Sequence, residues 1–313
     1  MTNKNKQNIL TATLVLIIIA VAVGYPAIQS RIAAQATCSP SPTTPPEDPE
    51  FDGQHAYEDI ATQLSFGPRI PGSDGHKAVI EWITQELKEN NWEVTRQSLE
   101  IEGHTVHNLI AHHGETEPAI ILGAHYDTRL WADEDPDPAQ HGQPVPGAND
   151  GASGVAVLLE LARATPPETQ TNTWLVFFDA EDQGRIAGWN WILGSTAFVE
   201  NLKSTPEAVV IVDMIADKDL NIYREKNSNK FLTDQIWNQA AELGYADVFI
   251  NEEKYSILDD HTPFLRADIP AVDLIDFDYP AWHTINDDIE QVSAESLQAV
   301  GDTLLNWLLS RTR

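Results

Sequence analysis

Cysteine is nearly absent from this chain, with Cys38 as the single cysteine among 313 residues. One cysteine excludes an intrachain disulfide and a metal cluster held by several thiolates. A lipid anchor on Cys38 is also disfavoured, because such sites carry an apolar residue three positions earlier and Gln35 stands there. A metal site in this chain would therefore use imidazole and carboxylate ligands.

Basic residues are also scarce. The chain has 19 Lys and Arg against 48 Asp and Glu, which gives a formal net charge of −29. Nucleic acids and anionic lipids bind positively charged surfaces, so this charge argues against both as partners. The length is sufficient for one large α/β domain or two smaller ones, and no internal repeat is visible.

One apolar run, Ile9–Ile28, contains no charged residue and follows two lysines. It is long enough to cross a bilayer with the N-terminus in the cytoplasm. A cleaved signal peptide is the alternative, because residues 34–36 read Ala-Gln-Ala, like a cleavage site. Both interpretations place the remainder outside the cytoplasm. We predict three parts: an anchor or signal peptide at 1–30, a Pro-rich linker at 31–52 and a single domain at 53–313.

In the domain, apolar runs typical of strands alternate with helical patterns. The segment Thr173–Phe178 is a continuous apolar run, as expected for a strand buried on both faces. The alternation predicts an α/β fold with a mixed, mostly parallel central sheet and helices on both faces. We expect further strands at 92–101, 106–111, 119–124, 208–214, 220–223, 248–250 and 271–275. We expect helices at 57–64, after Ser73, at 151–164, at 230–243 and at 292–309, with a short helix after His261.

Polar side chains recur where the predicted strands end, and ligands of open α/β sheets bind at the carboxyl ends of the strands. Adjacent buried acids such as Glu181 and Asp182 are unfavourable unless a cation or a proton accommodates them. Histidine and carboxylate without thiolate are suitable ligands for zinc. The strand-end set comprises His125, Asp127, Asp150, Glu181, Asp182, Asp213, Asp259 and His283.

These residues lie in motifs that resemble the M28 family of zinc exopeptidases and the related glutaminyl-peptide cyclotransferases. The resemblance runs from about Gly67 to the C-terminus and implies a zinc-exopeptidase-like fold. The motifs are Gly123-Ala-His-Tyr-Asp127, Gly147-Ala-Asn-Asp-Gly-Ala-Ser-Gly154, Phe177-Phe-Asp-Ala-Glu-Asp182, Asp259-Asp-His261 followed by Pro263-Phe-Leu265, and Trp282-His-Thr284.

The resemblance implies a role for each strand-end residue. Asp150, Asp182 and His283 would bind one zinc, and Glu181 would be the general acid/base. His125 and Asp213 would bind a second zinc in the two-zinc aminopeptidases, with Asp150 bridging. Asp127 would orient His125. The family carries Glu where this chain has Asp182, so a shorter carboxylate must reach the metal here.

Neighbouring residues favour the cyclase branch. Asp259 stands where aminopeptidases carry a small polar residue. In the cyclases this acid joins a hydrogen-bond chain with the equivalents of Glu181 and Asp213. Trp282 resembles the indole that walls the cyclase pocket, and Trp189 and Trp191 are candidates for the substrate entrance, although packing of a long loop would explain them equally well.

The resemblance therefore implies a one-zinc enzyme that converts the N-terminal Gln of peptides to pyroglutamate and releases ammonia. In that reaction Glu181 would move the proton, and Asp259 and Asp213 would raise its proton affinity. Two alternatives remain: an M28 aminopeptidase with two zinc ions, and a membrane-tethered binding domain without catalysis. The sequence does not indicate the oligomeric state.

Overall fold

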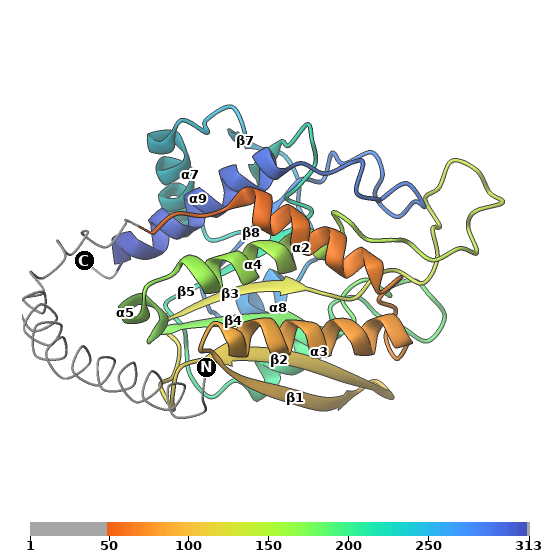
Figure 1. The fold of residues 1–313 in the computed structure, drawn as a ribbon, viewed down its shortest axis with the longest axis horizontal. Helices are drawn as coiled ribbons and strands as arrows, with labels where there is room; N and C mark the ends of the chain where they lie inside the picture. The colour runs from red at the N-terminus through yellow and green to blue at the C-terminus, as the bar shows by residue number, and fades with distance from the viewer. Residues whose placement is uncertain (1–48, 312–313) are drawn as a thin grey trace, which may run out of the picture. The chain divides into compact units, whose positions relative to one another are not determined.

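A six-stranded sheet forms the centre of the part of the chain that the structure describes, residues 49–311 (Figure 1). The structure is a computed structural model. The strands lie in the order β1–β2–β4–β3–β5–β8. They are β1 (Glu93–Ile101), β2 (His104–His112), β3 (Ile120–His125), β4 (Thr173–Phe178), β5 (Ala208–Asp213) and β8 (Ala271–Ile275). Two short strands, β6 (Ile222–Arg224) and β7 (Phe249–Glu253), form a separate parallel pair.

The central strands β4, β3 and β5 consist mainly of buried apolar residues. Every position of β3 and β5 is buried, and in β4 only Trp174 is partly exposed. β3 is parallel to both of its neighbours, and β5 is parallel to β8. Parallel strands covered on both faces are built from such continuous apolar runs. The segment 173–178 is thus a central strand, as predicted.

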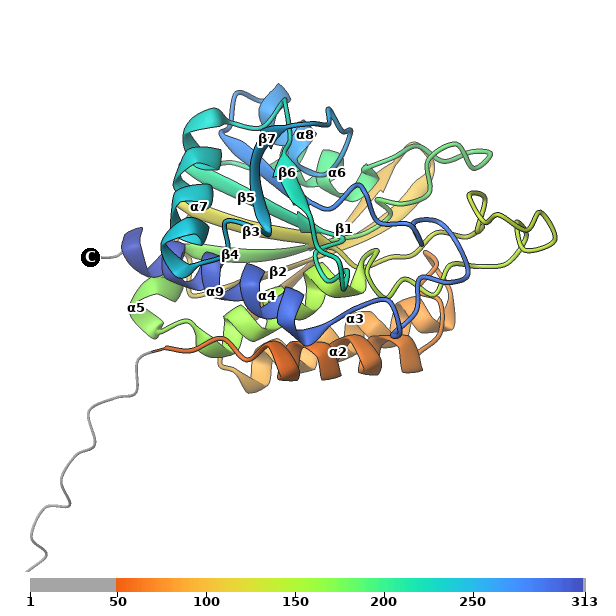
Figure 2. The ribbon, with the colours of Figure 1, turned by 90° about the horizontal axis from the view of Figure 1, so that it is seen from above.

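Helices cover both faces of the sheet, as Figure 2 shows from above. One face carries α2 (Gly53–Ser65), α3 (Asp74–Glu89), α4 (Ala152–Ala164) and α9 (Ala294–Arg311). The other carries α6 (Leu193–Asn201) and α8 (His261–Arg266), where Phe198 and Phe264 pack against Phe178. Beside α9 lies α7 (Lys230–Leu243). The predicted α/β architecture, a mixed and mostly parallel sheet between helices, is confirmed.

The first two strands depart from the parallel arrangement. β1 and β2 form an antiparallel hairpin, and β2 is antiparallel to β4. Glu102 and Gly103 connect β1 to β2, both with positive φ (52° and 85°). A two-residue turn joins only antiparallel strands, because a parallel pair needs a crossover of about a dozen residues or more.

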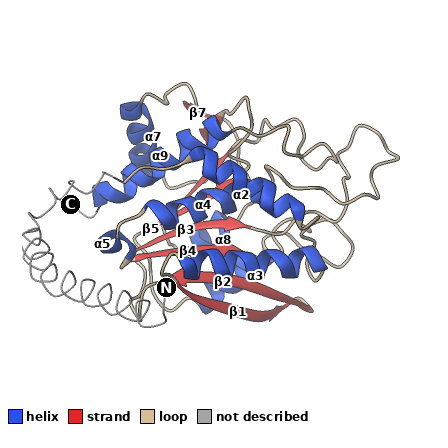
Figure 3. Cartoon of the chain, in the orientation of Figure 1, coloured by secondary structure: helices blue, strands red, loops and turns tan. Residues whose placement is uncertain are grey.

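Most predicted elements are present, and two helices were not predicted (Figure 3). The helix at 230–243 and the strand at 271–275 have the predicted bounds. The additional helices are α6 and the four-residue α5 (Pro167–Gln170). α6 follows Ile192, which has φ 55° and makes no side-chain capping hydrogen bond. It therefore lacks the polar N-cap that marks a helix start in a sequence.

The loops that follow β3, β4 and β5 gather at one end of the sheet, on the right in Figures 1 and 2. The described residues, 49–311, belong to one compact unit. Within residues 49–311, no helix combines the length and apolarity needed to span a bilayer. The predicted anchor or signal peptide at 1–30 lies outside the described residues, so the structure gives the anchor no support.

Gly154 allows α4 to lie close to the sheet. A Cβ on this glycine would lie 2.4 Å from the Val212 carbonyl oxygen and 2.8 Å from Ala124 Cβ. We predict that Gly154→Ala lowers the free energy of unfolding by about 1–3 kcal/mol, the usual cost of overpacking. This loss should exceed the gain in helix propensity of about 1 kcal/mol. Urea denaturation would measure it.

Gly142→Ala is the matched control, because a Cβ at Gly142 would meet no atom within 4 Å. We expect its free energy of unfolding to change by less than about 0.5 kcal/mol. Equal stability of the two variants would contradict the proposed close packing of α4.

Candidate active site

The structure brings together six of the predicted polar side chains at the carboxyl end of the sheet. His125 ends β3 and Asp213 ends β5. After β4, Ala180 has φ 54° and turns the chain so that Glu181 and Asp182 follow directly. The remaining two residues are Asp150, just before α4, and His283, in the loop after β8.

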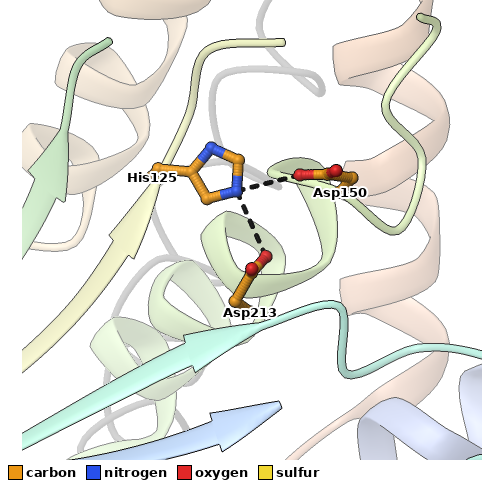
Figure 4. Close-up of side chains that lie close together, drawn as sticks. All are labelled: His125, Asp150 and Asp213. Atoms are coloured by element: carbon orange, nitrogen blue, oxygen red, sulfur yellow. Dashed lines mark hydrogen bonds and ion pairs between the residues drawn. The ribbon is translucent and has the colours of Figure 1, made fainter. Parts of the chain in front are cut away.

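His125 is the centre of one acidic group (Figure 4). Its Nε2 lies 3.1 Å from Asp150 Oδ1 and 3.1 Å from Asp213 Oδ1. Its Nδ1 lies 3.5 Å from Asp127 Oδ1. Burial lowers the pKa of His125, but the charge of Asp213 and hydrogen bonds with the surrounding carboxylates raise it well above the usual range.

A second group shares Asp150. His283 Nε2 lies 2.8 Å from Asp182 Oδ1 and 3.7 Å from Asp150 Oδ2. All three side chains are buried. In each group one ligand atom from every residue lies within 4.8 Å of the others, a spacing that could hold a metal ion.

The donor atoms of both groups fit zinc. They are imidazole nitrogens and carboxylate oxygens, the ligands that zinc takes when thiolates are absent. Asp182 Oδ2 and His125 Nδ1 are buried and make no hydrogen bond within the described part of the chain. Burial and the charge of Asp150 raise the pKa of Asp182 to about 6, although His283 opposes the shift. A divalent cation would stabilise these acids in their charged form.

Asp127 holds the turn that carries Glu181 and Asp182. Its carboxylate accepts hydrogen bonds from the backbone N–H of Glu181 at 3.0 Å and of Asp182 at 3.3 Å. The side-chain amide of Gln183 donates to the same carboxylate at 3.0 Å. Because Asp127 also faces His125, it links the loop after β3 to the loop after β4.

Glu181 lies in a strongly acidic environment. Burial raises its pKa well above the usual range, and the negative charges of Asp259 and Asp260 add to the shift, while His125 opposes it. An acid of this kind holds a proton more readily than an exposed glutamate, which is a property of general acid/base residues.

The expected hydrogen-bond chain through Asp259 is not present among the described residues. Asp259 is buried, but no hydrogen bond joins it to Glu181 or Asp213, and its Oδ2 has no partner there. Asp259 instead acts on both acids through like charge, which raises the pKa of each. The three acids are therefore neighbours coupled by charge.

A cavity of about 270 Å³ opens onto this site. Trp191 and Trp282 line it, and the Trp282 ring stacks on His283 with centroids 3.8 Å apart. Trp189 is not among the lining residues; it stacks on His104 with centroids 3.5 Å apart. Packing therefore explains Trp189, one of the two explanations that the sequence left open. The lining also includes Glu181, Asp150, Asp182, Asp213, Asp259, His283, Arg185, Met214, Tyr255, Ser256, Ile257, Leu258, Ile275 and Phe277.

Arg129 was not predicted from the sequence, although it binds the backbone of Asp182. Its Nη1 donates to the Asp182 carbonyl oxygen at 2.9 Å, and its Nε and Nη2 each donate to the Asp133 carboxylate at 2.6 Å. The guanidinium lies 4.9 Å from the centre of the Trp191 ring. The available signal was a basic residue two positions after Asp127 in a chain with few basic residues.

Two further positioning residues were missed. Asp287 accepts the backbone N–H of Asn149 at 2.8 Å and of Asp150 at 3.1 Å, so it fixes the Asp150 segment. Gly184 lies against the Trp191 ring, where an added Cβ would come within 2.0 Å of a ring atom. The Asp287 contacts have no local sequence signal, because they join segments that only the fold brings together.

Comparison with known proteins gives consistent relatives. Residues 108–308 match peptidase family M28. A crystal structure of Porphyromonas gingivalis glutaminyl cyclase has 33% identity and a TM-score of 0.79, over 83% of this chain and 99% of its own. A leucine aminopeptidase precursor from Bacteroides thetaiotaomicron has 33% identity and a TM-score of 0.77, over 83% of this chain and 98% of its own. Glutaminyl-peptide cyclotransferase of Boiga irregularis is 26% identical over 287 residues, with 77% of each chain covered.

The family match spans most of the described domain and includes every motif from residues 123–127 to residues 282–284. The solved relatives cover more than four fifths of this chain at about one third identity. The sequence motifs, the sheet and these matches agree, and the chain belongs to peptidase family M28.

Proposed function

We propose that this protein is a zinc-dependent glutaminyl-peptide cyclotransferase, which converts the N-terminal Gln of peptides to pyroglutamate and releases ammonia. The observation that carries the proposal is the small cavity that joins Glu181 to the Asp150–Asp182–His283 group beneath the Trp282 indole. The Porphyromonas and Boiga relatives are a glutaminyl cyclase and a glutaminyl-peptide cyclotransferase.

We assign the zinc ligands to Asp150, Asp182 and His283. All three line the cavity, whereas His125 of the other group does not. An ion on the cavity side would face the substrate directly. Zinc bound there supplies Lewis acidity to the γ-carbonyl of the substrate glutamine.

Glu181 is the proposed proton carrier. It lines the same cavity as the three ligands, and its raised pKa favours proton uptake. In the proposed reaction the α-amine nitrogen forms a bond to the carbonyl carbon of the side-chain amide (Cδ), while the bond from that carbon to the amide nitrogen breaks. Glu181 accepts the proton that the amine loses and donates it to the departing ammonia.

Asp259 assists through charge. It lies in the wall of the cavity, and its negative charge raises the proton affinity of Glu181. Asp213 belongs to the same charged cluster through its contact with His125. We therefore propose that both act through charge, Asp259 directly on Glu181 and Asp213 as part of the acidic cluster that lines the cavity.

The aromatic walls suit a reaction that consumes no water. Trp191 and Trp282 enclose the cavity beside His283. Displacing water from the bound glutamine would favour attack by the internal amine over hydrolysis. We therefore propose Trp191 and Trp282 as substrate-pocket residues. We do not include Trp189, which stacks on His104.

An aminopeptidase is the second candidate, because the His125–Asp150–Asp213 group has the spacing for another metal ion. The Bacteroides relative is a leucine aminopeptidase precursor. In that case Glu181 would activate water for hydrolysis. A binding domain without catalysis is disfavoured, since Asp150, Glu181, Asp182 and His283 are all present and adjoin one cavity.

We further propose that the enzyme acts outside the cytoplasm. This proposal depends on the apolar segment Ile9–Ile28 alone, which lies outside the described residues. Both an anchor and a cleaved signal peptide would export the domain.

The reaction itself is the first test. We expect the full-length protein to release ammonia from Gln-Ala and to leave Leu-Ala intact, as followed by mass spectrometry. Glutamine carries the γ-carboxamide that the internal amine attacks, and leucine carries no such group. Cleavage of Leu-Ala without cyclisation of Gln-Ala would instead establish the aminopeptidase.

Substitution of the proposed proton carrier gives a second test. We predict that Glu181→Gln lowers kcat by about 10²–10⁴-fold, the usual contribution of a general acid/base. Zinc content should stay unchanged, because Glu181 is not among the assigned ligands. Glu252→Gln, at an exposed position of β7, is the matched control and should keep full activity. Loss of zinc from the Glu181 variant would contradict this role.

Zinc content distinguishes the two reactions. We predict about one zinc per chain, within the three-ligand catalytic pattern. His283→Ala should remove it, whereas His125→Ala should retain it. Elemental analysis after gel filtration would measure both, with circular dichroism to verify folding. About two ions in the unmodified protein, with one lost in the His125 variant, would favour the aminopeptidase.

A further inference from the structure

The cavity has two chemically different ends. Its inner end is acidic and buried, with Asp150, Asp182 and Glu181 each at most 7% exposed. Its outer end carries exposed side chains, including Leu258 at 47% and Phe277 at 37%. If the N-terminal glutamine of a peptide occupies the inner end, the residues that follow it must leave past the outer end.

Arg185 is the one Lys or Arg side chain among the described residues that line this cavity. It is exposed, and within residues 49–311 it makes no side-chain hydrogen bond or ion pair. The chain has 48 acidic and 19 basic residues, so a cation that lines the acidic cavity without an acid partner remains available to an acidic ligand. Arg129, by comparison, is fully engaged with Asp133 and Asp182.

The backbone fixes the place of Arg185. Its φ of 62° lies in the left-handed region, which is costly for a residue with a Cβ. On one side Gly184 packs against Trp191, and on the other Ile186 is buried and donates its N–H to the Gln183 carbonyl oxygen at 3.2 Å. The side chain is therefore presented from an anchored turn beside the proposed zinc ligand Asp182.

The other cation near the outer end is already paired. Lys254 binds Asp278, and the Tyr255 hydroxyl donates to the same carboxylate. The lysine also lies over the rings of Tyr223 and Tyr255, at 4.1 Å and 5.0 Å from their centres. Among the described residues that line the cavity, Arg185 is thus the unpaired positive group.

We propose that Arg185 binds a carboxylate of the substrate peptide and makes the enzyme favour acidic residues directly after the N-terminal glutamine. The proposal rests on the cyclotransferase function. A guanidinium binds carboxylate through two parallel hydrogen bonds, which suits this chemistry better than a backbone amide or a neutral side chain. The net charge of −29 repels acidic peptides at long range, and Arg185 offsets that repulsion at the opening.

Two carboxylates could reach Arg185: the side chain of residue two, and the C-terminal carboxylate of a dipeptide. C-terminally amidated tripeptides with Glu, Gln or Lys at position two isolate the side chain. Gln-Ala and its amide isolate the terminal group. A preference for the Glu tripeptide would show that the side chain of residue two binds Arg185. A preference for Gln-Ala over its amide would show that the C-terminal carboxylate binds it.

The experiment measures kcat/KM for each peptide and compares ratios within each enzyme. For the unmodified protein we expect the Glu peptide to exceed the Gln peptide by about threefold to fivefold, the range for a partly exposed ion pair. The difference should lie in KM and should shrink as ionic strength rises. In Arg185→Ala the ratio should fall to about one, and in Arg185→Glu the Lys peptide should become the favoured substrate.

Arg266→Ala is the matched control. Arg266 ends α8, is exposed and does not line the cavity, so its removal changes the net charge equally and should leave the ratio intact. The inference is overturned if the unmodified protein prefers neither the Glu tripeptide nor the dipeptide with a free C-terminal carboxylate. It is also overturned if Arg185→Ala keeps the preference. Absence of ammonia from every Gln peptide with the unmodified protein would overturn the cyclotransferase function itself, and the inference with it.

Discussion

The site depends on how the Asp127 carboxylate binds the turn after β4. That turn must place two acids side by side at the end of a buried strand, where their mutual repulsion and burial are both unfavourable. Asp127 accepts both backbone N–H groups of the turn and faces His125. One buried carboxylate thereby fixes the loops of two adjacent parallel strands. It positions His125 of one candidate metal group and Asp182 of the other.

The positions of Asp213 and Asp150 follow from the parallel arrangement of the strands. Parallel strands end at one edge of the sheet, so Asp213 of β5 comes beside His125 of β3, and Asp150 enters from the start of α4. Asp150 then belongs to both metal groups. The same framework has the spacing for one ion or for two.

The sequence predicted the parts of the fold and site that local patterns encode. Apolar periodicity located the central strands, and family motifs located the strand-end residues. The sequence did not reveal α6, because Ile192 starts it without a polar cap, or the roles of Arg129 and Asp287, because both act across segments distant in the chain. It also indicated a hydrogen-bond chain through Asp259, whereas the described side chains interact there through charge.

The shorter carboxylate at Asp182 shows how such distant contacts complete the site. An aspartate reaches less far than a glutamate, so the backbone of Asp182 must lie closer to the proposed zinc than the backbone of a glutamate ligand would. Arg129 binds the Asp182 carbonyl oxygen at 2.9 Å and lies 3.7 Å from Asp182 Oδ1, while His283 approaches that oxygen at 2.8 Å. Asp127 holds the Asp182 N–H on the other side. The backbone of this residue is therefore held at both its donor and its acceptor, which fixes the point from which the shorter side chain extends.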